Sequence, residues 1–390
     1  MKVLFLSQRV PYPPNRGDKI TTWRLVERLA REHTVEIVAF AHDQADEQAA
    51  RALREKSFDV SVFPPTPRWR CLPLLLGSRP LTLGVYGSRA LQAEVDRRIG
   101  GVDLAYAYSS SMGAFLEKHA GKPRIMHLGE LDSDKWRQYA GRVGFPHSWV
   151  YGREARRLEV FERRLAAAMD ENVFCTPLEQ KIFQERIPGA SSLVLRNGVD
   201  LAHHAPATEP PRPGRLVFVG VMNYYPNVEG IAWFCREMLP EVRRRVPEAT
   251  LAIVGSQPTP EVLALARQPG VEVTGFVDDP RQWLREAAVS VAPLRIARGI
   301  QNKVLEAMAM GLPVVGTRSA TQGVDGEAGR DYVLADSAEE QVEAVCALLR
   351  EPERARELGR RARAFVEQNY DWEVCLRPLD TLLQRLSRVR

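Results

Sequence analysis

The sequence has few cysteines, and none of them is paired at the spacing of a metal or redox site. Five cysteines are scattered along 390 residues, at Cys71, Cys175, Cys235, Cys346 and Cys375. An odd number without any C-x-x-C motif argues against a disulfide framework and against a zinc site. We therefore expect a protein of a reducing compartment, the cytoplasm.

Long apolar runs, dense basic stripes and glycine fingerprints for phosphate are also missing. No run approaches the roughly 20 apolar residues that cross a bilayer, and the opening MKVLFLS is expected to be a buried strand. Lys and Arg outnumber Asp and Glu by 54 to 49, a mild excess that suits anionic ligands or an anionic membrane surface and does not indicate nucleic acid. Neither G-x-G-x-x-G nor G-x-x-x-x-G-K-[ST] occurs, so a dinucleotide fingerprint and a P-loop are unsupported.

The length of the chain predicts two domains, because 390 residues exceed what one core usually holds. Residues 205–214, APATEPPRPG, contain four prolines and are the predicted linker. We expect one α/β domain over residues 1–204 and a second over 215–370. A terminal helix over 371–390 is expected to return to the first domain.

The stretch PLRIARGIQNKVLEAMAMGLPVVGT covers residues 293–317. With the residues just before it, it predicts a strand over 288–294, a helix over 301–310 and then a second strand. The N–H groups of the first helical turn attract phosphate, and Lys303 adds a full charge there. Glu306 lies three residues further on the same face, where it suits sugar hydroxyls. Together they favour a nucleotide, with diphosphate on the helix start and ribose on Glu306. The alternative is an ordinary amphipathic helix whose charges are solvated.

LEAMAMGLPVVGT resembles the donor-site signature E-G-F-G-L-P-x-L-E-A-M-A-x-G-x-P-V-V of the retaining glycosyltransferases of family 4. RVPYPPNRGDKI, HLGELDSDKW, CTPLEQKIF and FVGVMNYYPNVEG further resemble one subgroup of that family. Its members are sugar transferases associated with bacterial exopolysaccharide clusters that carry the PEP-CTERM/exosortase sorting system. Where the family has the first of its paired glutamates, this sequence has Arg298.

The resemblance implies an α/β protein of the GT-B type, with two Rossmann-like domains whose parallel sheets face a central cleft. The first domain is expected to hold the acceptor and the second a nucleotide sugar, without a metal ion or a cofactor. The implied catalytic residues are His127, Asp132 and Lys303. The implied donor-binding residues are Gly17, Gly220, Asn223, Val277, Arg298, Gly299, Ile300, Gln301, Asn302, Lys303 and Glu306. Packing for His127, and helix capping for Asp132, are the structural alternatives.

An apolar, aromatic stretch, PRWRCLPLLLGSRPLTLGVYGSR, carries Arg68, Arg70, Arg79 and Arg89. An apolar segment with basic residues around it is a candidate for lying on a membrane surface or for holding a lipid-linked acceptor. A buried helix edge with cationic ends explains the same composition.

These observations predict a retaining transferase that moves a sugar from a nucleotide-diphosphate sugar to a glycan or a polyprenyl-diphosphate-linked saccharide. We expect it to serve bacterial exopolysaccharide biosynthesis, in the cytoplasm and in peripheral contact with the inner membrane. Two alternatives stay open at this point. One is a nucleotide-sugar epimerase on a similar scaffold, and the other is a non-catalytic partner that binds the nucleotide sugar.

Overall fold

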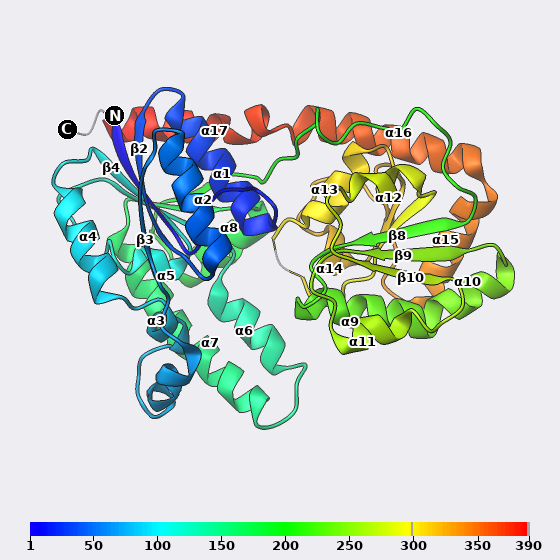
Figure 1. Cartoon of the computed structure of the whole chain (residues 1–390), viewed down its shortest axis with the longest axis horizontal. Helices are drawn as coiled ribbons and strands as arrows, with labels where there is room; N and C mark the ends of the chain where they lie inside the picture. The colour runs from blue at the N-terminus through cyan, green and yellow to red at the C-terminus, as the bar shows by residue number, and fades with distance from the viewer. Residues whose placement is uncertain (298, 388–390) are drawn as a thin grey trace. The chain divides into compact units, whose positions relative to one another are not determined.

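The computed structural model describes residues 1–297 and 299–387, which fold as two compact units (Figure 1). The first unit comprises Met1–Arg196 with Leu376–Arg390, and the second comprises Asn197–Cys375. The division comes after Arg196 rather than after residue 204, because the following residues pack against the second unit. Val199 pairs with Asp371, and a Cβ on Gly198 would lie 2.9 Å from the Trp372 ring. The predicted linker, 205–214, therefore belongs to the second unit.

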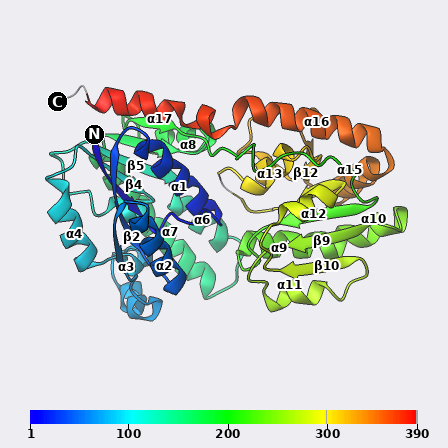
Figure 2. The same cartoon turned by 45° about the horizontal axis from the view of Figure 1, so that its top comes forward.

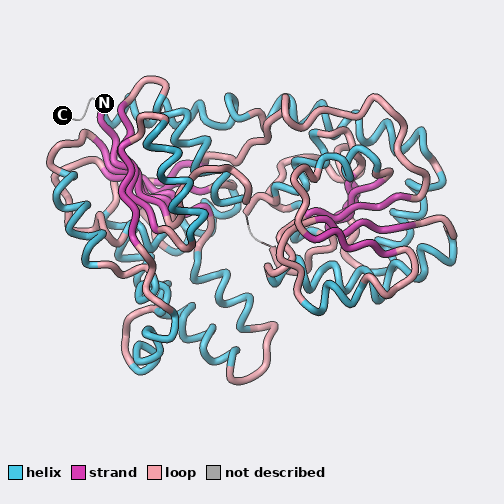
Figure 3. Tube along the Cα trace, viewed as in Figure 1, coloured by secondary structure: helices cyan, strands magenta, loops and turns pink. Residues whose placement is uncertain are grey.

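A parallel seven-stranded sheet of order β3-β2-β1-β4-β5-β6-β7 forms the centre of the first unit. Its strands are β1 (Lys2–Ser7), β2 (Thr34–Phe40), β3 (Asp59–Phe63), β4 (Leu104–Tyr108), β5 (Arg124–Gly129), β6 (Glu171–Phe174) and β7 (Ser192–Val194). The inner strands are apolar along their length because helices cover both faces of the sheet (Figure 3). Strand order reverses between β1 and β4, the place where open α/β sheets bind ligands.

The helices of the first unit are α1 (Gly17–Ala30), α2 (Gln44–Glu55), the 3₁₀ helix η1 (Arg68–Leu76), α3 (Leu81–Val85), α4 (Arg89–Ile99), α5 (Ser110–Gly113), α6 (Asp132–Ala140), α7 (His147–Ala168), α8 (Pro177–Arg186) and, over most of its length, α17 (Trp372–Ser387). The Thr176 hydroxyl accepts a hydrogen bond from the Glu179 N–H and so caps α8. Asp380 of α17 pairs with Arg28 of α1 at 2.5 Å, which fastens the terminal helix to this unit.

A parallel six-stranded sheet of order β10-β9-β8-β11-β12-β13 forms the centre of the second unit (Figure 2). Its strands are β8 (Arg215–Val219), β9 (Thr250–Val254), β10 (Val271–Gly275), β11 (Val289–Ala292), β12 (Val314–Gly316) and β13 (Val333–Leu334). Its helices are α9 (Tyr225–Trp233), the π-helical turn η2 (Phe234–Met238), α10 (Leu239–Arg245), α11 (Pro260–Leu265), α12 (Arg281–Glu286), α13 (Asn302–Ala309), α14 (Arg318–Thr321), α15 (Ala338–Arg350) and α16 (Pro352–Asn369). Here strand order reverses between β8 and β11.

The strand–helix–strand unit predicted around residue 300 is present as β11, α13 and β12. Gly311 follows α13 with a φ of +72°, the left-handed conformation of a glycine that ends a helix. The segment after β12 begins with the short helix α14. Its first turn is capped by the Thr317 hydroxyl, which accepts from the Ala320 N–H at 3.2 Å.

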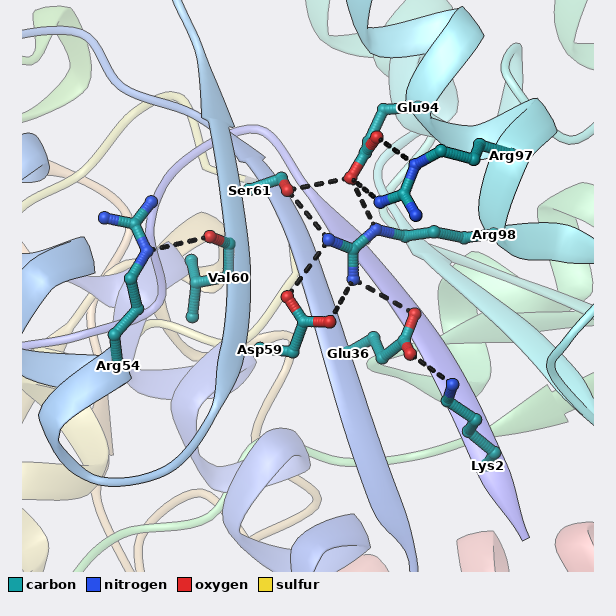
Figure 4. Close-up of polar contacts among 9 residues, drawn as sticks. All are labelled: Lys2, Glu36, Arg54, Asp59, Val60, Ser61, Glu94, Arg97 and Arg98. Atoms are coloured by element: carbon teal, nitrogen blue, oxygen red, sulfur yellow. Dashed lines mark hydrogen bonds and ion pairs between the residues drawn. The ribbon is translucent and has the colours of Figure 1, made fainter.

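A partly buried ion cluster lies at the edge of the first sheet where the strands begin (Figure 4). The Arg98 guanidinium of α4 donates to Glu94 at 2.6 Å, to Glu36 at 3.0 Å, to Asp59 at 3.0 Å and to Ser61 at 2.9 Å. Arg98 is 8% exposed, and these four partners neutralise its charge or accept its hydrogen bonds. Burial of the guanidinium is therefore compensated. The cluster joins α4 to β2 and β3.

No helix in the described part of the chain has both the length and the apolarity needed to cross a membrane.

Candidate active site

In the second unit, the start of α13 presents backbone N–H groups beside a lysine. Gly299 takes a φ of +61°, and Gln301 precedes the helix in an extended conformation without capping it through its side chain. No acidic residue stands in the first turn. The first-turn N–H groups of α13, which carry the positive end of the helix dipole, thus accompany Lys303 next to the carboxyl end of β11.

Lys303 is held by Asn227, which is not among the predicted donor residues. Its Nζ donates to Oδ1 of Asn227 at 2.7 Å, while Nδ2 of Asn227 donates to the Val221 carbonyl at 2.9 Å. The ammonium also lies 5.2 Å from the centre of the Phe218 ring. Burial lowers the pKa of Lys303 to about 8, against the opposing effect of Glu306. The sequence feature that could have identified Asn227 as a partner of Lys303 is its position in the first turn of the helix after β8.

Gly220, directly after β8, is a glycine because its neighbours approach it closely. A Cβ at this position would lie 2.6 Å from Nδ2 of Asn227 and 3.4 Å from Cε of Lys303. On its other side, a Cβ on Gly255 would lie 1.7 Å from the Gly220 carbonyl oxygen. The turn after β8 therefore leaves its backbone beside the lysine, at the reversal of strand order.

Glu306 lies one turn into α13 and is half-buried. Burial raises its pKa, while Lys303 and His203 act in the opposite direction. A carboxylate of this kind accepts hydrogen bonds from hydroxyl groups, and its position beyond the first turn separates it from the N–H groups that favour an anion.

The other predicted donor residues have different surroundings. Asn223 is exposed and donates to Gln257, and Val277 is half-buried after β10. Ile300 is 8% exposed. Nearby, Arg295 pairs with Glu229 and lies 4.9 Å from the Trp233 ring. Asn302 opens α13. Arg298 lies outside the described residues.

In the first unit, His127 near the end of β5 is buried and neutral. Its side chain is 1% exposed, and burial lowers its pKa to about 3. Nδ1 forms a hydrogen bond of 2.7 Å with the Tyr106 hydroxyl. Nε2 is buried without a hydrogen-bond partner among the described residues. His127 can therefore hold a hydrogen bond, but it cannot act as a cationic acid at neutral pH.

Asp132 opens α6 beside the turn that follows β4. Its Oδ2 accepts from the Ser110 hydroxyl at 2.7 Å, and its Oδ1 accepts from Lys135 at 2.6 Å. Burial would raise its pKa, but Lys135 and Ser110 together outweigh it and lower the pKa. Asp132 is thus an ionised carboxylate with one charged and one neutral partner.

A second carboxyl group behind Asp132 was not expected from the sequence. Glu162 of α7 is 3% exposed and accepts from the N–H and the hydroxyl of Ser133, at 3.0 and 2.5 Å. Burial, with a further contribution from Asp132, raises its pKa to about 8. Glu162, and not Asp132, caps the start of α6. Its position in a long helix with many charged residues gave no local signal for this contact.

A cavity of about 310 Å³ opens in the first unit next to the same turn. Its lining comprises Arg79, Leu83, Tyr86, Gly87, Ser88, Arg89, Gln92, Ser111, Ala114 and Phe115. Ser111 accepts from the Gln8 side chain at 2.7 Å, which ties the turn after β4 to the residue after β1. The lining offers two arginines, several neutral hydrogen-bonding groups and no acid, so it suits a polar or anionic ligand.

Gly17, the remaining predicted donor residue, is exposed at the start of α1 in the first unit, whereas the other predicted donor residues belong to the second. The loop before it is fastened by Arg9, which lies 3.7 Å from both Asp18 and Asp46. Within the described residues, no group of three His, Cys, Asp or Glu side chains is placed to hold a metal ion.

Residues 213–351 match the family model described as glycosyl transferases group 1. A protein from Klebsiella pneumoniae, described as an uncharacterized 44.6 kDa protein in the cps region, is 19% identical over 95% of this chain and 96% of its own length. A phosphatidyl-myo-inositol mannosyltransferase from Propionibacterium freudenreichii is 27% identical over 48% of this chain and 49% of its own. The residues matched by the family model all lie within the second unit.

Solved structures share the architecture of the whole chain. A sucrose-phosphate synthase from Thermosynechococcus elongatus aligns with a TM-score of 0.75 and 17% identity, covering 100% of both chains. HepE from Anabaena, solved in complex with UDP, aligns with a TM-score of 0.70 and 16% identity over 99% of this chain and 100% of its own. The fold is thus the expected α/β GT-B fold, with parallel sheets of seven and six strands.

Proposed function

We propose that this protein is a retaining glycosyltransferase that moves a sugar from a nucleotide-diphosphate sugar to a glycan or lipid-linked saccharide. The observation that carries the proposal lies within the second unit. Lys303, fixed by Asn227, and the first-turn N–H groups of α13 stand beside the close-packed Gly220, at the reversal of strand order. The match of residues 213–351 to the glycosyl transferases supports the same reading.

The donor roles follow from the chemistry of each group. The α13 N–H groups, from Gln301 onward, and Lys303 would hold the diphosphate, while Glu306 would accept from the ribose hydroxyls. The backbone near Val277 would face the base. Gly299 and Ile300, before α13, complete the proposed donor set together with Asn302 and Asn223. Arg298, outside the described residues, is included from its place in the sequence alone. Because HepE was solved with UDP, a uridine nucleotide is the first donor to test.

The acceptor is proposed to bind in the first unit. The cavity lined by Arg79 and Arg89 offers room for a polar group, and it adjoins the turn that places Ser110 against Asp132. Asp132 would accept a hydrogen bond from an acceptor hydroxyl. His127, which is buried and neutral, would contribute indirectly, by holding the Tyr106 hydroxyl through Nδ1. Gly17 allows the loop before α1 to approach the substrates.

The proposed chemistry proceeds with retention. The bond between the anomeric carbon and the diphosphate oxygen breaks while the acceptor oxygen bonds to the same face of that carbon. The departing diphosphate takes the proton of the acceptor hydroxyl, so the atoms and charges balance. Lys303 and the α13 dipole stabilise the negative charge that develops on the diphosphate, and we propose that they do so without a metal ion or a cofactor.

The proposed setting is bacterial exopolysaccharide synthesis at the cytoplasmic face of the inner membrane. The relative from a cps region of Klebsiella supports a role in polysaccharide synthesis. We extend this proposal to the clusters that carry the PEP-CTERM/exosortase system, because the sequence motifs favour that subgroup.

The proposal is tested with a panel of nucleotide sugars. A donor that binds only the native state should raise the melting temperature, and transfer should then release nucleoside diphosphate only when an acceptor extract is added. Lys303→Ala should abolish release while its circular dichroism stays unchanged. Interconversion of two nucleotide sugars would instead favour an epimerase, and donor binding without any turnover would favour a non-catalytic partner.

A further inference from the structure

Five large apolar side chains of the first unit are exposed on two segments. On η1, Trp69 is 66%, Leu72 is 61% and Leu76 is 96% exposed. Before and at the start of α7, Phe145 is 85% and Trp149 is 51% exposed. Apolar side chains of this size are usually buried, so such a group marks a surface that contacts something else.

The two segments are held together by buried polar contacts. Arg153 of α7 donates to the carbonyls of Leu74 and Gly77, at the end of η1. The neighbouring Glu154 accepts from the N–H groups of Leu81 and Thr82, both at 2.8 Å, and so caps α3. Trp149 stands one helical turn before Arg153 on the same face of α7. In Figure 1, the segment η1, drawn beside α3, and the turn between α6 and α7 lie at the same end of the first unit.

The charge around these side chains has one sign. Residues 64–89 and 141–157 contain a single acid, Glu154, which is 2% exposed and already bound. The exposed basic residues of these ranges are Arg68, Arg70, Arg79, Arg89, Arg142, Arg156 and Arg157. One of them, Arg70, lies 5.0 Å from the Trp69 ring.

We propose that this surface, the η1–α7 patch, binds the surface of an anionic lipid bilayer. The patch is defined by Trp69, Leu72, Leu76, Phe145 and Trp149 with the seven exposed arginines. Its apolar side chains would enter the boundary between headgroups and acyl chains, where tryptophan is favoured, and its arginines would contact lipid phosphates. A protein interface is a weaker match, since such interfaces are depleted of charge at their centre. The inference does not rest on the proposed transfer reaction, because lipid binding is measured without substrates.

The test uses the full chain and sucrose-loaded vesicles of phosphatidylcholine, with and without phosphatidylglycerol. We expect sedimentation with the anionic vesicles, weakening as salt is added. Trp69→Ser combined with Leu76→Ser should weaken binding about tenfold or more, because two apolar groups no longer leave water. Arg68→Gln combined with Arg70→Gln should reduce the preference for phosphatidylglycerol, because two of the seven arginines lose their charge.

Two exposed apolar positions outside the patch provide matched controls. Leu263→Ser in the second unit, at 52% exposure, and Val160→Ser on α7, at 70%, should leave vesicle binding unchanged. All variants change exposed side chains, so their unfolding midpoints should match the parent. Absence of binding to anionic vesicles, or equal losses in patch and control variants, would overturn the proposal. A concentration-dependent dimer that the Trp69/Leu76 variant abolishes, without vesicle binding, would assign the patch to self-association and also overturn it.

Discussion

The ammonium nitrogen of Lys303 lies 2.7 Å from Oδ1 of Asn227, a side chain 76 residues earlier in the chain. Asn227 is itself 3% exposed and fixed to the turn after β8. The amide has no charge, so it positions the ammonium without neutralising it. The full charge of the lysine therefore stays available to an anion at the start of α13.

The first prediction concerns the pH dependence of donor binding. Burial lowers the pKa of Lys303 to about 8, and a bound diphosphate favours the charged form. Above pH 8 the lysine must take up a proton on binding, so the affinity for UDP should fall by up to about tenfold per pH unit. Lys303→Arg, which stays charged, should show a flat profile between pH 7 and 9 in calorimetric titrations. The same steep decline in that variant would disprove the assignment.

The second prediction separates the ribose from the diphosphate. Glu306→Gln should weaken UDP binding about five- to tenfold, because a carboxylate that accepts charge-assisted hydrogen bonds from hydroxyls becomes a neutral amide. Inorganic pyrophosphate, which has no hydroxyl groups to offer, should bind the variant at least as well as the parent. A parallel loss for both ligands, measured by competition titration, would place Glu306 at the phosphates instead.

The third prediction uses the raised pKa of Glu162. Its pKa is about 8 in the folded protein, above the ordinary value of 4.5. Between these pH values the unfolded chain has lost the proton while the folded chain keeps it, so the folded state binds more protons. The free energy of unfolding should therefore fall as pH rises from about 5 to 8. Glu162→Gln should reduce this slope, as measured by urea denaturation at several pH values, and an unchanged slope would contradict the raised pKa.

The fourth prediction concerns the ion cluster around Arg98. Arg98→Ala leaves the carboxylate of Glu36, which is 6% exposed, with less compensating charge, and should cost about 3–5 kcal/mol of unfolding free energy. Arg97→Ala is the matched control, because Arg97 meets Glu94 at the surface and exposed pairs contribute at most about 1 kcal/mol. Similar midpoints for both variants in urea would show that the cluster adds little.

Local patterns were enough to predict the elements that carry the proposed donor site. The apolar strand, the glycine and the helix with Lys303 and Glu306 are present as β11, Gly299 and α13. These features depend on hydrogen bonds and backbone preferences between residues close in sequence. They can therefore be predicted from short stretches of the sequence.

Contacts between residues far apart in the sequence could be identified only from the tertiary structure. The pairing of Lys303 with Asn227, the contact of Glu162 with Ser133 and the exposure of η1 have no counterpart in local spacing. The same holds for the division after Arg196, which depends on Val199 meeting Asp371. By itself the sequence determined the α/β elements and indicated the residues that we propose bind an activated sugar. The tertiary structure decided which of these residues are in contact. The burial and the pKa of a side chain depend on its neighbours in space, and these cannot be read from the order of residues in the chain.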